Sequence, residues 1–126
     1  MLPNVRIVGA DPVGSVLGGG EAGALYMVEG IGYDFFPRSL DRSVVDEWVK
    51  TDDPTAFALA LRLVREEAML VGGSSGSAMQ AALKVAETAP EGSRIVVILA
   101  DNIRNYMTKF LDPDWMAEKG FPDPLA

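Results

Sequence analysis

The chain is organised around the stretch Val71–Ser77, which reads VGGSSGS. The apolar run Met69–Val71 leads into it, and a helical pattern over Ala78–Ala89 follows. A strand, a tight glycine turn and a helix start often build a small-molecule site, because glycine accepts positive φ and lets a ligand approach the backbone. Two interpretations stay open at this point: a ligand site, or an ordinary strand-to-helix turn capped by Ser75 or Ser77.

Composition limits the class of protein. The 126 residues suffice for one domain, and the hydrophobic fraction of 48% is that of a globular protein. The net charge of −7 argues against nucleic acid, since a phosphate-binding surface needs clustered Lys and Arg. No apolar run has the length that crosses a bilayer, so we expect no membrane partner and a soluble, cytoplasmic protein. The absence of cysteine fits a reducing compartment without proving one.

Two missing residue types exclude several catalytic centres. With no His and no Cys, the chain has no Ser-His-Asp triad, no thiol nucleophile and no usual zinc site, and we expect no metal. Any acid–base chemistry must come from Lys, Tyr, Asp or Glu, or from a cofactor.

The hydrophobic pattern predicts alternating strands and helices. Expected strands are Val5–Ala10, Leu25–Val28 and Arg94–Ala100. Expected helices run from Asp41 or Ser43 through Trp48, from Asp53–Pro54 to Ala68, over Ala78–Ala89, and over Asp114–Gly120. This order predicts an α/β fold with a parallel sheet and helices on both faces.

Arg94–Ala100 is the clearest predicted strand. Its almost continuous apolar run is typical of a central parallel strand. Such a strand needs neighbours on both sides, and about three strands is fewer than the usual five to six. The chain is therefore expected either to pair with other chains or to form part of a larger domain.

Three motifs together resemble one family. They are EGIGYDF at residues 29–35, GGSSGS at 72–77, and DNIRNYM at 101–107 with WMAEKGF at 115–121. In this order and spacing the chain resembles the C-terminal part of the catalytic core of the cystathionine β-synthase family. The resemblance covers nearly the whole chain, which divides into that core portion at 1–121 and a tail or linker start at 122–126. The related cysteine synthases share the Gly/Ser stretch and match less well at Gly-Ile-Gly-Tyr.

The resemblance implies the large domain of a fold type II enzyme that uses pyridoxal phosphate. The expected fold is a three-layer parallel sheet with helices on both faces. Members of the family replace the β-substituent of serine with a thiol such as homocysteine, giving cystathionine. The resemblance also implies a homodimer in the complete enzyme.

The resemblance assigns roles to four residues. Ser74 matches the serine that hydrogen-bonds the pyridine nitrogen of the cofactor. Gly30 and Gly32 match a cofactor-binding loop that lines the substrate entrance, and Tyr33 on that loop is the candidate catalytic side chain. A neutral hydroxyl at the nitrogen makes the ring a weaker electron sink than a carboxylate would.

The chain departs from the family in two ways. Ala100-Asp101-Asn102 stands where the family usually has Pro-Asp-Ser. The Schiff-base lysine and the phosphate-binding loop lie in the earlier half of the family's core, and none of the four lysines matches it. We therefore expect this chain to be inactive alone. The alternatives are a cysteine synthase, which accepts sulfide, and a non-catalytic module that binds a partner or a small anion.

Overall fold

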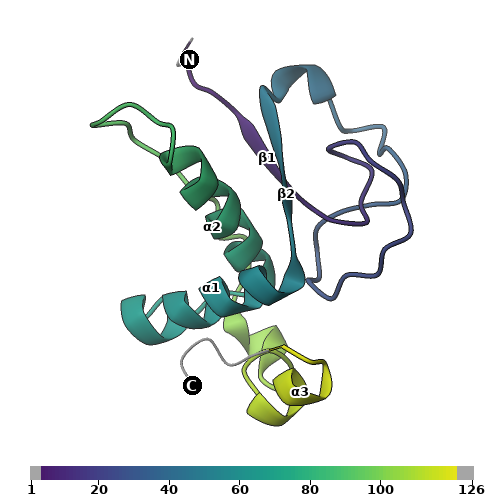
Figure 1. Cartoon of the computed structure of the whole chain (residues 1–126), viewed down its shortest axis with the longest axis vertical. Helices are drawn as coiled ribbons and strands as arrows, with labels where there is room; N and C mark the ends of the chain where they lie inside the picture. Colours follow the sequence, from purple (N-terminus) through teal and green to yellow (C-terminus); the bar gives the residue numbers. More distant parts are fainter. Residues whose placement is uncertain (1–3, 122–126) are drawn as a thin grey trace.

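The computed structural model describes residues 4–121, which form parallel strands and helices (Figure 1). The elements in chain order are β1 (Val8–Pro12), the 3₁₀ helix η1 (Arg42–Val44), β2 (Glu47–Thr51), α1 (Asp53–Glu67), α2 (Gly73–Ala86), the 3₁₀ helix η2 (Ile103–Tyr106) and α3 (Pro113–Glu118). The α/β class with parallel strands is confirmed. The last residues, 122–126, for which a tail or linker start is predicted, lie outside the described part.

The two strands pair in parallel, from Val8 opposite Glu47 to Pro12 opposite Thr51. Asp46 fixes the register at one end, because its carboxylate accepts a hydrogen bond from the Ile7 N–H at 2.7 Å. The strand expected at Val5–Ala10 is thus present, but it begins three residues later and ends two residues later than expected.

The helix expected from Asp41 or Ser43 through Trp48 is wrong. Only the short η1 is helical, and Glu47–Thr51 forms β2. The caps that signalled a helix start are real, since Asp41 accepts a hydrogen bond from the Ser43 N–H. The segment nevertheless becomes a strand because it pairs with β1, which lies some forty residues earlier in the chain. Local capping signals carry no information about so distant a partner.

Helix α1 follows its sequence pattern. Asp52 caps it by accepting a hydrogen bond from the Thr55 N–H at 3.0 Å, and Pro54 occupies the first turn, where a missing N–H costs nothing. Its buried face carries Ala56, Phe57, Ala60, Leu61 and Leu63.

Helix α2 begins at Gly73, five residues before the expected start at Ala78. The Gly/Ser stretch is therefore the first turn and a half of a helix, not a loop. Its glycines are not at positive φ, contrary to expectation. A Cβ on Gly76 would lie 1.8 Å from the Ala56 carbonyl oxygen, and one on Gly73 would lie 2.9 Å from the Phe57 ring. Glycine is needed here because α1 and α2 cross in contact.

The core lies on the side of α1 away from the strands. Phe57 stacks on Phe110 with ring centroids 5.5 Å apart and meets Trp115 of α3 edge to face at 5.7 Å. Tyr106, Met116 and Phe121 also pack in this largely aromatic core. The predicted short helix at Asp114–Gly120 is present as α3, and it closes the lower end of the molecule (Figure 1).

Two predicted strands are absent from residues 4–121. Leu25–Val28 is an irregular segment, which Asp53 holds by accepting a hydrogen bond from the Val28 N–H. Residues 94–100 run back along α2 with no backbone hydrogen bond to another described segment, and Val96 and Ile98 are 78% and 75% exposed. An apolar run becomes a strand only when a partner strand takes up its N–H and C=O groups, and β1 does not reach it. In the described part of the chain, no helix is long and apolar enough to cross a membrane.

Candidate functional site

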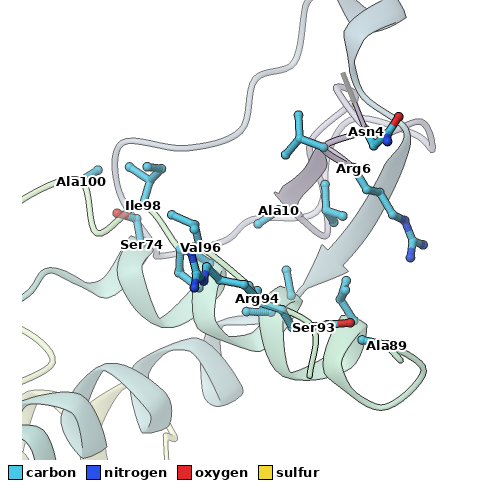
Figure 2. Close-up of a pocket in the computed structure, with 18 of the residues that line it drawn as sticks. Asn4, Arg6, Ala10, Ser74, Ala89, Ser93, Arg94, Val96, Ile98 and Ala100 are labelled. Atoms are coloured by element: carbon cyan, nitrogen blue, oxygen red, sulfur yellow. The ribbon is translucent and has the colours of Figure 1, made fainter. Parts of the chain in front are cut away.

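A hollow of about 750 Å³ lies along α2, between β1 and residues 93–100 (Figure 2). Its floor is α2, from Ser74 at the N-terminal end to Ala89 beyond the C-terminal end. Its walls are the segments around Asn4–Ala10 and Arg94–Ala100. Both walls run towards the N-terminus of α2 (Figure 2), so Ser74 lies where they end. In α/β folds, ligands bind at this edge, outside the carboxyl ends of the strands.

Ser74 is the polar group at that end. The residue is only 9% exposed, lines the hollow, and has no hydrogen-bond partner among residues 4–121. Its neighbours Ser75 and Ser77 are buried without partners and do not line the hollow. The capping interpretation is wrong for both, because the N-cap is Gly72, without a side-chain hydrogen bond. Of the three serines, Ser74 alone presents its side chain to a ligand.

Asp101 and Tyr106 brace the start of α2. The Gly72 N–H donates to the Asp101 carbonyl at 3.3 Å, and a Cβ on Gly72 would lie 2.0 Å from Asp101 Oδ1. The Tyr106 hydroxyl donates to Asp101 Oδ2 at 2.5 Å. This hydrogen bond, assisted by burial, raises the pKa of Tyr106 to about 12. Sequence reasoning missed this brace, for which only the DNIRNYM motif was a signal.

The Gly-Ile-Gly-Tyr loop reaches the same hollow through Ile31. Gly30 and Gly32 take φ values of 82° and 75°, a region that favours glycine, and Ile31 between them lines the hollow. Glu29 before the loop forms an ion pair with Lys109. The predicted cofactor-binding residues Gly30 and Gly32 thus shape the backbone on either side of Ile31, which lines the hollow together with Ser74. Ile31 carries no chemical group that marks it as a site residue in the sequence.

Tyr33 is not part of the hollow's lining. Its side chain is 47% exposed, and its ring packs edge to face on Phe35 at 5.0 Å. Its backbone is fixed, because its N–H donates to Ser15 Oγ at 3.0 Å and its carbonyl accepts from the Val16 N–H at 2.9 Å. The structure therefore brings Ser74 and the Gly-Ile-Gly segment together and leaves the Tyr33 side chain at the outer end of the loop.

The residues present fit one end of a flat aromatic cofactor. An unpartnered hydroxyl stands beside apolar Ile31, Ile98 and Ala100, which suits a ring whose nitrogen meets the Ser74 oxygen. No lysine lines the hollow: Lys50 pairs with Asp11 at 2.6 Å, and Lys109 pairs with Glu29. Within residues 4–121, no group of three or more acidic side chains gathers as a metal site.

Comparisons with known proteins agree with this geometry. A model of the "Pyridoxal-phosphate dependent enzyme" family matches residues 1–101. The chain belongs to this family. It is 54% identical over 127 residues to the cystathionine β-synthase of Dictyostelium discoideum and 52% identical over 124 residues to that of Rattus norvegicus. It is 38% identical over 108 residues to a cysteine synthase of Helicobacter pylori. The recognised resemblance is thereby confirmed.

Solved structures give the same family. A crystal structure of O-ureido-L-serine synthase bound to O-ureido-L-serine superposes with a TM-score of 0.81 at 32% identity, over 96% of this chain and 40% of that one. An O-acetylserine-dependent cystathionine β-synthase from Helicobacter pylori gives 0.75 at 39% identity, over 85% of this chain and 35% of that one. The alignment covers 98% of this chain and 26% of the Dictyostelium relative. The chain therefore spans about a quarter of the length of that relative.

Proposed function

We propose that this chain forms the Ser74-bearing part of a pyridoxal-phosphate-dependent cystathionine β-synthase. The reaction replaces the hydroxyl of serine with the thiol of homocysteine, giving cystathionine and water. The observation that carries the proposal is the unpartnered Ser74 hydroxyl in an apolar hollow, at the strand ends of a chain that is 54% identical to such an enzyme. When bound, the cofactor supplies the electron sink that this chemistry needs.

The chain's own residues would hold and enclose the ring end of the cofactor. The Ser74 hydroxyl would donate a hydrogen bond to the ring nitrogen, and Ile31 and Ile98, which line the same hollow, would exclude water from the ring faces. Asp101 and Tyr106 hold the first turn of α2, so the position of Ser74 does not depend on the ligand. A fixed neutral donor leaves the ring nitrogen uncharged, which suits prompt loss of the β-substituent.

Tyr33 is proposed to act at the substrate entrance. The side chain is half exposed at the end of the Gly-Ile-Gly-Tyr loop, while its backbone is held to Ser15 and Val16. Reaching a bound serine would require the loop to move towards the hollow, and Gly30 and Gly32 are positions where the backbone has the most conformational freedom. The proposed role is to assist departure of the serine hydroxyl.

A chimera tests the activity with a complete catalytic core. Residues 1–126 replace the segment of the Dictyostelium enzyme that aligns with them. We expect the chimera to bind pyridoxal phosphate and to form cystathionine from serine and homocysteine, while the free 126-residue chain forms none. Ser74→Ala should lower kcat at least tenfold, since a lost hydrogen bond to a charged or polarised group is worth about 1.5–3 kcal/mol. A folded chimera that holds the cofactor and forms no cystathionine would contradict the proposal.

A cysteine synthase is the second candidate. The cysteine synthase relative and the O-acetylserine-dependent structure favour testing an activated serine and sulfide. The same chimera, supplied in turn with serine or O-acetylserine and with homocysteine or sulfide, distinguishes the two. Faster turnover of O-acetylserine with sulfide would assign the chain to cysteine synthesis.

A further inference from the structure

A turn at the end of β1, residues 13–18, holds the Tyr33 end of the Gly-Ile-Gly-Tyr loop. Ser15 Oγ accepts a hydrogen bond from the Tyr33 N–H at 3.0 Å, and the Val16 N–H donates one to the Tyr33 carbonyl at 2.9 Å. Since both peptide groups of Tyr33 are held, the direction in which its side chain leaves the backbone is also fixed. In this position the side chain is outside the lining of the hollow, and its ring packs on Phe35.

An ion pair fixes this turn to the two strands. Asp11 of β1 lies opposite Lys50 of β2 in the register, and Lys50 Nζ donates to Asp11 Oδ2 at 2.6 Å. The same ammonium group donates to the Ser15 carbonyl at 2.6 Å, and Asp11 Oδ2 also accepts from the Gly18 N–H at 2.8 Å. Asp11 and Ser15 are both buried. Because hydrogen bonds to charged groups are stronger than neutral ones, the turn is held more firmly than the loop that it contacts.

The loop, in contrast, is attached to the turn by neutral hydrogen bonds. Gly30 and Gly32 take φ values of 82° and 75°, and glycine can leave this region for other conformations at little steric cost. A Cβ on Gly32 would lie 2.6 Å from Pro12 Cγ, so the loop lies directly against the end of β1. Once the hydrogen bonds at Tyr33 break, the loop can therefore separate from β1, with its two glycines taking up the backbone rotation.

We propose that Ser15 is a positioning residue for Tyr33, an inference that rests on the proposed action of Tyr33 on serine. Ser15 Oγ holds the tyrosine at the outer end of the loop, and its hydrogen bond with the Tyr33 N–H breaks when the side chain turns to a bound serine. The binding free energy of serine then includes the cost of this break. The Ser15 hydroxyl therefore lowers the apparent affinity for serine and keeps Tyr33 away from the hollow until serine is present.

Fluorine NMR of the chimera described above, loaded with pyridoxal phosphate, follows the position of Tyr33. 3-Fluorotyrosine is incorporated at position 33 alone, and serine is added stepwise. We expect serine to shift the fluorine signal. In Ser15→Ala, the serine concentration at half of the full shift should fall about threefold to tenfold, because one neutral hydrogen bond no longer holds the outer position. An unchanged or higher concentration at half-shift would overturn the proposal, as would a signal that does not respond to serine.

Hydrogen exchange of the Tyr33 amide separates this role from general damage to the fold. In the serine-free chimera, the amide should exchange at least about threefold faster in Ser15→Ala, while the α1 amides keep their protection. Ser77→Ala is the matched control, because it removes the hydroxyl of another buried serine, one without a hydrogen-bond partner in the described part of the chain. It should change neither the exchange of the Tyr33 amide nor the half-shift concentration. Equal exchange in the two variants would overturn the proposal.

Steady-state kinetics separate the role of Ser15 from the reaction itself. With homocysteine in excess, Ser15→Ala should lower the KM for serine about threefold to tenfold and change kcat by less than about twofold, whereas a general loss of structure raises KM or lowers kcat. If the half-shift concentration falls and the chimera forms no cystathionine, the proposed reaction fails while the positioning role of Ser15 stands. If cystathionine forms and the half-shift concentration is unchanged, the proposed reaction stands and the positioning role is overturned.

Discussion

At the scale of single residues, the serines of the Gly/Ser stretch have different functions in spite of their identical chemistry. Ser74 is in the one position that faces the hollow, whereas Ser75 and Ser77 are buried with unpartnered hydroxyls. Helical geometry separates them, because successive side chains point about 100° apart. The chemistry of the stretch therefore depends on one hydroxyl, and its glycines serve packing.

The pair Asp101 and Tyr106 gives a pH-dependent prediction. The pKa of Tyr106 is raised from 10.0 to about 12 by its hydrogen bond to Asp101 and by burial. The folded state holds this proton more tightly than the unfolded state, so the contribution to stability is complete below pH 10 and is lost as the pH rises to about 12. We expect the free energy of unfolding to fall by about 2–3 kcal/mol over this range.

Two variants provide the control for Tyr106. In Tyr106→Phe, the free energy of unfolding should not show this decline. In Tyr33→Phe the decline should remain, since Tyr33 is half exposed. Chemical denaturation at several pH values measures the free energy of unfolding of each variant. An unchanged decline in Tyr106→Phe would contradict the assignment.

Gly76 gives a prediction about packing. A Cβ at this position would lie 1.8 Å from the Ala56 carbonyl oxygen and 3.0 Å from the Ala60 nitrogen. Both are backbone atoms, so α1 and α2 must separate to make room. Gly76→Ala should lower the free energy of unfolding by about 3 kcal/mol, at the upper end of overpacking costs. Ser77→Ala is the matched control and should change it by under about 1 kcal/mol, because its hydroxyl has no partner to lose. Equal melting temperatures for the two variants would refute the close crossing.

At the scale of elements, the start of α1 joins three parts of the chain. Asp52 caps α1 and accepts a hydrogen bond from Gln80 of α2 at 2.8 Å. The next residue, Asp53, accepts from the Met27 and Val28 N–H groups, which precede the Gly-Ile-Gly-Tyr loop. The start of α1 therefore also positions the segment that leads into the loop carrying Ile31.

Asp52→Ala tests this junction. Desolvation opposes ionisation of Asp52, but the hydrogen bonds from Thr55 and Gln80 together outweigh it and lower the pKa. Because the pKa is lowered, the Asp52 carboxylate contributes fully to stability when the pH is above its ordinary pKa of 3.8. This contribution is lost as the pH falls through the pKa of the folded state. Asp52→Ala should lower the free energy of unfolding by about 1 kcal/mol at neutral pH, and in acid the variant and the unaltered chain should be equally stable. Asp41→Ala, which removes the cap of the exposed η1, should leave the free energy of unfolding nearly unchanged at every pH. A cost for Asp52→Ala that persists unchanged in acid would contradict the role of its charge.

At the scale of the whole molecule, the predictions from sequence succeeded where the signals were local. Helix α1 has its cap, its early proline and its apolar spacing within one segment, so it was found. Strand β2 was missed because its identity depends on β1. Residues 94–100 have the composition of a central strand, yet the described chain offers them no partner.

The candidate site shows the same division. Ser74 was identified through the motif resemblance, and the structure places it in the hollow with Ile31, which no motif singled out. Tyr33 was chosen from the same resemblance and lies outside the lining. The brace of Asp101 on Gly72 could not be read from sequence, since it arises from the contact of two segments thirty residues apart.

The central claim is that the Ser74 hydroxyl meets the ring nitrogen of the cofactor. Nitrogen-15 NMR of the chimera loaded with ring-labelled pyridoxal phosphate tests it most directly. We predict an unprotonated ring nitrogen at neutral pH with Ser74, and a shift towards the protonated form in Ser74→Asp, because an adjacent carboxylate stabilises the positive charge. The same nitrogen signal in both proteins would show that residue 74 does not contact the ring nitrogen and would contradict the account.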